Sequence, residues 1–156
     1  MTRRAPTHRY AHSEKAGYAQ NSWSIRKPKT LYGMTSTRFF AVTAGLEVGA
    51  GLALVVAPAL VIRLLLGLHE IETGVVIGRL AGAALLSLGA ACWWARHDGG
   101  SVAARGLVSG LLIYNAAVVA LALSGSFGSL GPLLWAAVVV HGAMAIWCVW
   151  LLCIRG

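Results

Sequence analysis

Residues 39–62 read FFAVTAGLEVGAGLALVVAPALVI, and Glu47 is the only ionisable side chain among them. A helix needs about 20 apolar residues to cross the roughly 30 Å of hydrocarbon in a bilayer. The stretch therefore predicts a membrane-spanning helix, whose end lies at Ile62 or as late as Leu66. Pro58 lies late in this stretch, where it predicts either a kink or the last turn inside the membrane.

Three further apolar stretches follow, over residues 74–95, 102–123 and 132–153. Polar turns join them at residues 97–101 (HDGGS) and 124–129 (SGSFGS). Because short loops force neighbouring helices to run in opposite directions, the sequence predicts an all-α, antiparallel up-down bundle of four membrane helices over residues 39–155. The chain is 58% hydrophobic. A short soluble chain has no means of covering four helices that almost lack a polar face.

Positive charge is concentrated before the first span. Eight of the 13 lysines and arginines lie in residues 1–38, a basic and polar tail that we expect to be flexible. Arg96, Arg105 and Arg155 fall on the same side of the predicted bundle, and Arg63 falls on the other. Since lysine and arginine favour the cytoplasmic side, both termini are predicted to be cytoplasmic in a multi-pass protein of the bacterial inner membrane. Tryptophans near the predicted span ends are typical of an interfacial belt: Trp93, Trp94, Trp135, Trp147 and Trp150.

The origin of the tail has more than one interpretation. Residues 1–33 are either an arm attracted to anionic lipid or an extension upstream of a true start at Met34. A mitochondrial transit peptide has a similar composition, which makes the mitochondrial inner membrane a minor alternative location. The predicted orientation is the same with or without the tail.

Several classes of function lack their sequence signals. The net charge is +8, but no aromatic or glycine-rich binding motif accompanies it, so no nucleic-acid partner is expected. The cysteines, Cys92, Cys148 and Cys153, lie in predicted spans without metal-ligand spacing, so no metal or other cofactor is expected. Neither a nucleophile elbow, a zinc-protease motif, a P-loop nor a carboxylate pair is present, and we predict no catalytic residues and no enzymatic activity.

Small residues recur at every fourth position in three spans. In a bilayer, such stripes let helix backbones approach closely, and this contact replaces the hydrophobic drive that lipid does not supply. The predicted packing glycines are Gly45 and Gly49 in the first span, Gly74, Gly78 and Gly82 in the second, and Gly106 and Gly110 in the third. The partner helix belongs to this chain, to a second copy in a homo-oligomer, or to another membrane subunit.

Each span also carries a polar side chain well inside it. The candidate intramembrane site consists of Glu47, Arg79, Tyr114, Asn115 and His141. Counting the rise per residue from the cytoplasmic boundary places Glu47 about 12 Å deep, Asn115 and His141 about 18 Å, and Arg79 about 24 Å. The group therefore predicts a polar ladder rather than a direct salt bridge between Glu47 and Arg79. Three roles are open: hydrogen bonding between helices, a polar path, or contact with a partner subunit.

The chain resembles small bacterial four-helix membrane proteins of the DoxX-like type. The resemblance covers roughly residues 39–155 and rests on residues 45–49 (GLEVG), 57–58 (AP), 64–67 (LLLG), 78–83 (GRLAGA) and 91–96 (ACWWAR). It implies a four-helix fold, and some members are implied to be accessory subunits of membrane redox complexes. This chain has no redox-ligand motif, so no activity is carried over.

Two functional hypotheses follow from these patterns. The leading one is a non-enzymatic inner-membrane protein that works as a subunit or accessory factor of a larger membrane complex. The glycine stripes, the minimal loops and the missing catalytic set favour it. The alternative is a small transporter or proton-conducting protein that uses the intramembrane polar ladder.

Overall fold

The computed structural model describes residues 31–67, 72–125 and 131–154, and within these ranges it contains helices and no strand. The helices are α2 (Leu31–Val56), α3 (Pro58–Leu66), α4 (Glu72–Ala95), α5 (Val102–Leu123) and α6 (Leu134–Cys153). Four of them, all except α3, are long and apolar enough to cross a membrane. The all-helical prediction is confirmed. Of the predicted flexible tail over residues 1–38, residues 1–30 lie outside the described residues, and residues 31–38 form the first turns of α2.

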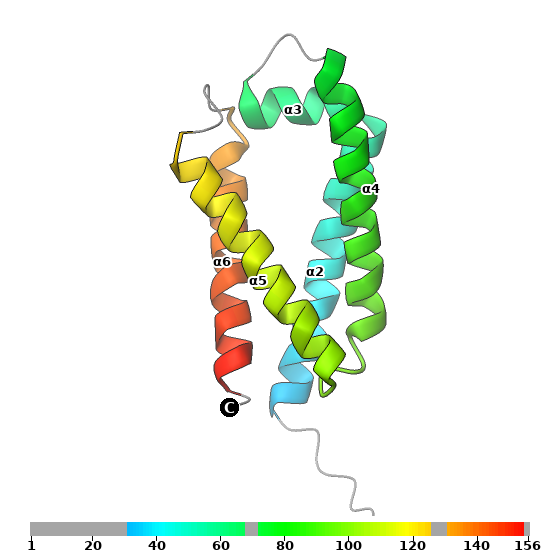
Figure 1. Cartoon of the computed structure of the whole chain (residues 1–156), viewed down its shortest axis with the longest axis vertical. Coiled ribbons are helices and arrows are strands. Elements are labelled where there is room, and N and C mark those ends of the chain that lie inside the picture. Colours follow the sequence, from blue (N-terminus) through cyan, green and yellow to red (C-terminus); the bar gives the residue numbers. More distant parts are fainter. Residues whose placement is uncertain (1–30, 68–71, 126–130, 155–156) are drawn as a thin grey trace, which may run out of the picture.

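The first predicted span is divided by Pro58. Helix α2 begins at Leu31 rather than Phe39 and ends at Val56 rather than Ile62. Ala57 leaves the helical conformation at φ −132° and ψ 55°, and Pro58 occupies the first turn of α3. A proline has no N–H to donate and disfavours helical geometry at the residue before it, so the chain turns here. Helix α3 consequently lies across one end of the bundle (Figure 1).

The four long helices form two closely packed pairs, α2 with α4 and α5 with α6 (Figure 1). Glycines allow the first pair to approach: a Cβ on Gly82 would lie 2.7 Å from the carbonyl oxygen of Gly51. Gly89 approaches Val48, whereas Gly78 approaches Leu54 of α2 as well as Pro58 and Ile62 of α3. Contacts thus move backward along α4 as they move forward along α2.

Two structures join the helix pairs at opposite ends. At one end, the backbone N–H groups of Gly131 and Leu133 donate to the carbonyl oxygens of Leu65 and Leu64, both at 3.0 Å. These bonds tie α3 to the segment that leads into α6. Gly131 is buried there against the Leu64 carbonyl, which leaves no room for a Cβ. Helix α6 itself begins at Leu134, two residues after its predicted start at Pro132.

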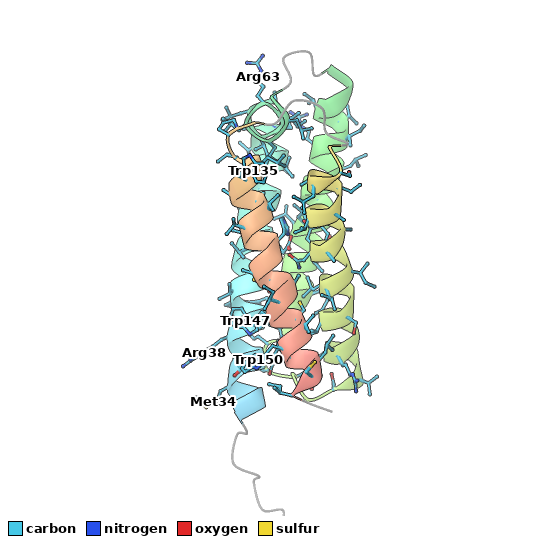
Figure 2. The ribbon with its side chains drawn as sticks, turned by 90° about the vertical axis from the view of Figure 1, so that its left-hand side faces the viewer. Met34, Arg38, Arg63, Trp135, Trp147 and Trp150 are labelled. Atoms are coloured by element: carbon cyan, nitrogen blue, oxygen red, sulfur yellow. The ribbon has the colours of Figure 1, made fainter. Side chains whose placement is uncertain are left out.

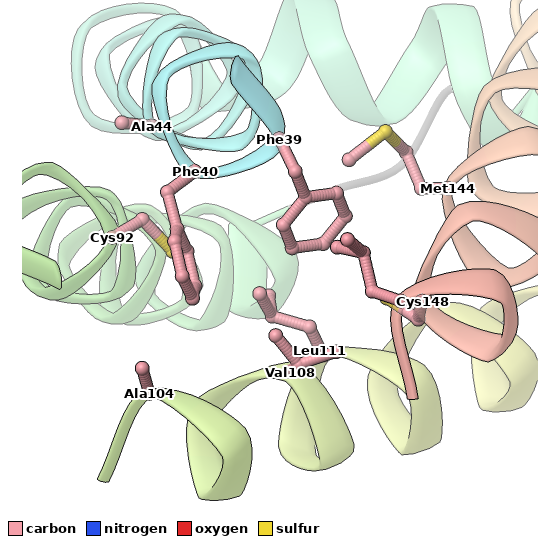
Figure 3. Packing of buried hydrophobic residues seen from close by; sticks show 10 residues of the cluster. Phe39, Phe40, Ala44, Cys92, Ala104, Val108, Leu111, Met144 and Cys148 are labelled. Carbon is pink, nitrogen blue, oxygen red and sulfur yellow. The ribbon is translucent and has the colours of Figure 1, made fainter. Parts of the chain in front are cut away.

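An apolar cluster joins the pairs at the other end, where α2 begins and α6 ends (Figure 3). Phe39 is fully buried, and its ring makes edge-to-face contacts with Phe40 at 5.5 Å and Trp147 at 5.4 Å between centroids. Aromatic pairs prefer this geometry because the positive ring edge meets a negative ring face. Residues from all four long helices contribute to the cluster: Phe39, Phe40, Ala44, Cys92, Ala104, Val108, Leu111, Met144, Cys148 and Leu151.

Candidate functional site

Glu47 faces the interior because it shares a helix face with the apolar cluster. Phe39, Thr43 and Glu47 follow one another at intervals of four residues, which places them above one another on α2. Phe39 is fully buried, so the turns that follow it on this face also point inward. Thr43 donates its hydroxyl hydrogen to the Phe39 carbonyl at 2.9 Å, and Glu47 is only 7% exposed.

The polar residues of α5 and α6 also lie on helix faces that point inward. Asn115 continues the buried face that begins with Val108 and Leu111, and it is 2% exposed. His141 lies on the face of α6 that buries Met144 and Cys148, and it is half-buried. These faces meet across the α5–α6 pair.

Asn115 and His141 form a hydrogen bond between α5 and α6. The distance from His141 Nδ1 to Asn115 Oδ1 is 2.7 Å. The Asn115 amide nitrogen donates to the carbonyl oxygen of Leu111, also at 2.7 Å. Tyr114 packs its ring edge-on to His141, with centroids 5.4 Å apart and planes at 87°. The two residues predicted to lie at one depth are thus bonded to each other.

This bonding pattern fixes the hydrogen on the imidazole of His141. The Asn115 nitrogen is committed to the Leu111 carbonyl, because the reversed amide would bring two oxygens together. The Asn115 oxygen therefore faces His141 as an acceptor, and Nδ1 must carry the hydrogen of that bond. In the neutral ring, Nε2 is then left as a hydrogen-bond acceptor.

A cavity of about 120 Å³ lies between α2, α5 and α6 and brings most of the candidate residues together. Its polar lining consists of Thr43, Glu47, Tyr114, Asn115 and His141, and its apolar lining of Leu46, Ala50, Val140 and Met144. At about 30 Å³ for each water molecule, the volume holds about four waters. Polar residues that are distant in the sequence therefore form one compact site.

The carboxyl group of Glu47 has no partner among the side chains and backbone of residues 31–67, 72–125 and 131–154. Neither a hydrogen bond nor an ion pair reaches it within that part of the chain. Its oxygens are not sealed off by protein atoms either, so they face the cavity. A buried carboxyl group that lacks partners requires a proton, water or a ligand to satisfy it.

Arg79 lies away from this site. Its side chain is exposed on α4, while the preceding Gly78 faces α2 and is buried. Arg79 does not line the cavity. The structure therefore reduces the predicted ladder to Glu47, Tyr114, Asn115 and His141. Arg79 is not buried opposite Glu47.

The predicted packing glycines fall into two groups. Gly78 and Gly82 contact α2, as described above, whereas a Cβ on Gly45, Gly49, Gly106 or Gly110 would meet no atom within 4 Å. Gly74 is half-buried. The sequence interpretation missed Gly51 and Gly89, which do lie at the crossing. A signal for them exists at intervals of seven residues, in Ala44 and Gly51 on α2, which Pro58 continues at the start of α3, and in Gly82 and Gly89 on α4.

Comparisons with known proteins gave no significant match to a family model, to a curated protein or to a solved structure. The resemblance to DoxX-like proteins therefore stays a prediction. No group of three or more potential metal ligands occurs in the described part of the chain. The function is therefore inferred from the geometry of the cavity and from the outer faces of the helices.

Proposed function

We propose that the four long helices span a bacterial inner membrane, with the start of α2 and the end of α6 on the cytoplasmic side. Both of these ends lie at the same end of the molecule (Figure 1). Arg38 lies toward that end and Arg63 lies at the opposite one, on α3 (Figure 2). Trp135 lies toward the Arg63 end, and Trp147 and Trp150 lie toward the other (Figure 2). Tryptophans at two levels suit two membrane interfaces.

Within that membrane, the chain works as a small transporter or proton-conducting protein that uses the interior cavity. The observation that carries this proposal is the unpartnered carboxyl group of Glu47, buried in an apolar span and facing the cavity. Hydrogen bonding between helices accounts for Asn115 and His141, which satisfy each other. It does not account for Glu47. An ionisable residue inside a membrane helix typically marks a path for ions or protons.

The cavity groups have complementary roles in such a path. Glu47 takes up and releases a proton, and His141 Nε2 accepts a hydrogen bond from water or a bound species. Asn115 is a positioning residue, because its bond to Nδ1 fixes the ring of His141. The available volume has room for about four waters, which would connect Glu47 with His141.

Ion flux in proteoliposomes tests this function. The purified chain is expected to carry protons or a small cation across the membrane, and Glu47→Gln and His141→Ala are expected to abolish or strongly reduce the flux. Ser87→Ala is the matched control, since the exposed Ser87 hydroxyl bonds only within its own helix, to Ala83 at 2.9 Å. Absence of flux, or flux that is unchanged in both cavity variants, would contradict the proposal.

A second function, as a subunit or accessory factor of a larger membrane complex, is favoured by a different observation. Gly45 and Gly49 on α2, and Gly106 and Gly110 on α5, are exposed, and a Cβ added to any of them would meet nothing within 4 Å. Glycine stripes promote close helix contact in membranes. A further helix, from a second copy or from another membrane protein, fits these faces.

Extraction in mild detergent followed by native mass spectrometry tests the second function. The chain is expected to elute as a homo-oligomer or with another membrane protein, and Gly49→Leu is expected to dissociate the assembly. Ala84→Leu, at an exposed position of α4, is the matched control. A monomer without any co-purifying protein would count against this role.

A further inference from the structure

The open polar atoms around the cavity are mostly hydrogen-bond acceptors. Glu47 contributes two carboxyl oxygens, and His141 contributes Nε2. Thr43 has given its hydroxyl hydrogen to Phe39, so its oxygen retains only acceptor capacity toward the cavity. Tyr114 supplies a hydroxyl that either donates or accepts. A ligand that complements this lining must therefore donate several hydrogen bonds.

The charge of the cavity lining also indicates which kind of ligand fits. Among the residues that the structure describes, Glu47 is the only acidic side chain that lines the cavity, and no arginine or lysine lines it. Within the described ranges, no cation lies in ion-pair distance of its carboxylate. When it is ionised, a carboxylate that is 93% buried needs a counterion, because an unpaired charge is costly in hydrocarbon. The ligand that compensates it carries a positive charge.

The volume and lining limit the size and type of the cation. About 120 Å³ accommodates a cation of a few heavy atoms together with water. Hard metal cations such as Ca²⁺ take about six to eight oxygen ligands. This lining offers fewer oxygens and adds an imidazole nitrogen.

The geometry points to a binding site for ammonium or a short primary alkylammonium ion, with Glu47 as its counterion and His141 Nε2 as a second acceptor. This inference rests on the proposed function of the cavity, whose ligand class it names. The N–H groups of the cation donate to the Glu47 carboxylate and to the imidazole. Asn115 keeps that imidazole in the accepting tautomer through its bond to Nδ1.

Equilibrium binding of radiolabelled methylammonium to the full chain in phosphatidylglycerol/phosphatidylethanolamine nanodiscs tests the inference. We expect saturable binding that ammonium displaces and that potassium and tetramethylammonium do not displace. Glu47→Gln should weaken binding at least about tenfold, since a hydrogen bond to a charged group contributes a factor of that size or more. Glu47→Asp should retain part of the affinity. Ser87→Ala should bind as the wild type does, and circular dichroism verifies the fold of each variant.

Three outcomes would overturn the inference: no saturable methylammonium binding to the wild type, displacement by potassium as effective as that by ammonium, or unchanged binding in a folded Glu47→Gln variant. Parallel flux measurements separate this site from the transport proposal. Methylammonium binding without flux supports the binding site and contradicts transport. Proton flux without methylammonium binding supports transport and contradicts the binding site.

Discussion

The side chain of Asn115 connects its own helix to the next one, because its nitrogen is bonded to Leu111 and its oxygen to His141. Such a bond in an apolar environment contributes modestly, since an unfolded chain in the membrane also finds partners. Its geometric effect is larger than its energy: it fixes the orientation and the tautomer of the imidazole. Asn115 thus holds the site in place, whereas Glu47 carries its charge.

The Asn115–His141 bond is expected to appear as a coupling energy. In a double-mutant cycle of Asn115→Ala and His141→Ala, the interaction term for reversible unfolding should be about 0.6 kcal/mol and no more than about 1.7 kcal/mol. Unfolding in mixed detergent micelles measures it. Ser109→Ala is the control, because the Ser109 hydroxyl bonds only to Arg105 within α5, at 3.1 Å. Additive effects of the two cavity substitutions would show that the bond does not contribute.

In the same unfolding measurement, replacement of Glu47 should not lower the free energy of unfolding. It has no partner within the described part of the chain, so Glu47→Gln removes no intramolecular bond. The variant should unfold with a free energy equal to or higher than that of the wild type, because a neutral amide is easier to bury than a carboxylate. A loss of more than about 1 kcal/mol would indicate a structural partner for the carboxyl group.

Helix contacts depend on which small residues face each other, and this yields a prediction for α2 and α4. In Gly82→Ala, the new Cβ would lie 2.7 Å from the Gly51 oxygen and 2.9 Å from Val55 Cγ2. The helices must separate, so we expect a loss of about 1–3 kcal/mol in the free energy of unfolding. Gly49→Ala, which meets nothing within 4 Å, should cause no loss in the monomer. Equal effects of both substitutions would contradict this packing.

The sequence predicted features that depend on local composition and missed those that depend on helix rotation. Length and hydrophobicity identify four long helices, and polar residues in apolar spans identify Glu47, Asn115 and His141 as inward candidates. Gly78 packs against α2 and α3, and its neighbour Arg79 therefore points away from them. The sequence of a single span does not reveal this packing. Similarly, the separate helix α3 follows from the turn at Pro58, and apolar residues on both sides of it conceal that turn.

The whole molecule consists of two helix pairs that meet firmly at their ends and less closely between them. An aromatic cluster around Phe39 closes one end, and α3 with residues 131–133 ties the other. The cavity lies between these two closures, about one to three turns of α2 beyond Phe39. This arrangement places the cavity between the two ends of the helices.

At the scale of the whole molecule, the prediction is which end of the helix bundle faces the periplasm and which end faces the cytoplasm. We expect Arg63 to face the periplasm and Asp98 to face the cytoplasm, because Arg38 lies at the end of the molecule opposite Arg63, and Arg96 and Arg105 flank the α4–α5 turn that contains Asp98. In a chain whose native cysteines are replaced by alanine, Arg63→Cys should react with a membrane-impermeant maleimide in intact cells. Asp98→Cys, equally exposed, should react only after permeabilisation. The cysteine-free chain measures background labelling. The reverse pattern would invert the topology, and labelling of both sites in intact cells would contradict a bundle with its two ends on opposite sides of the membrane.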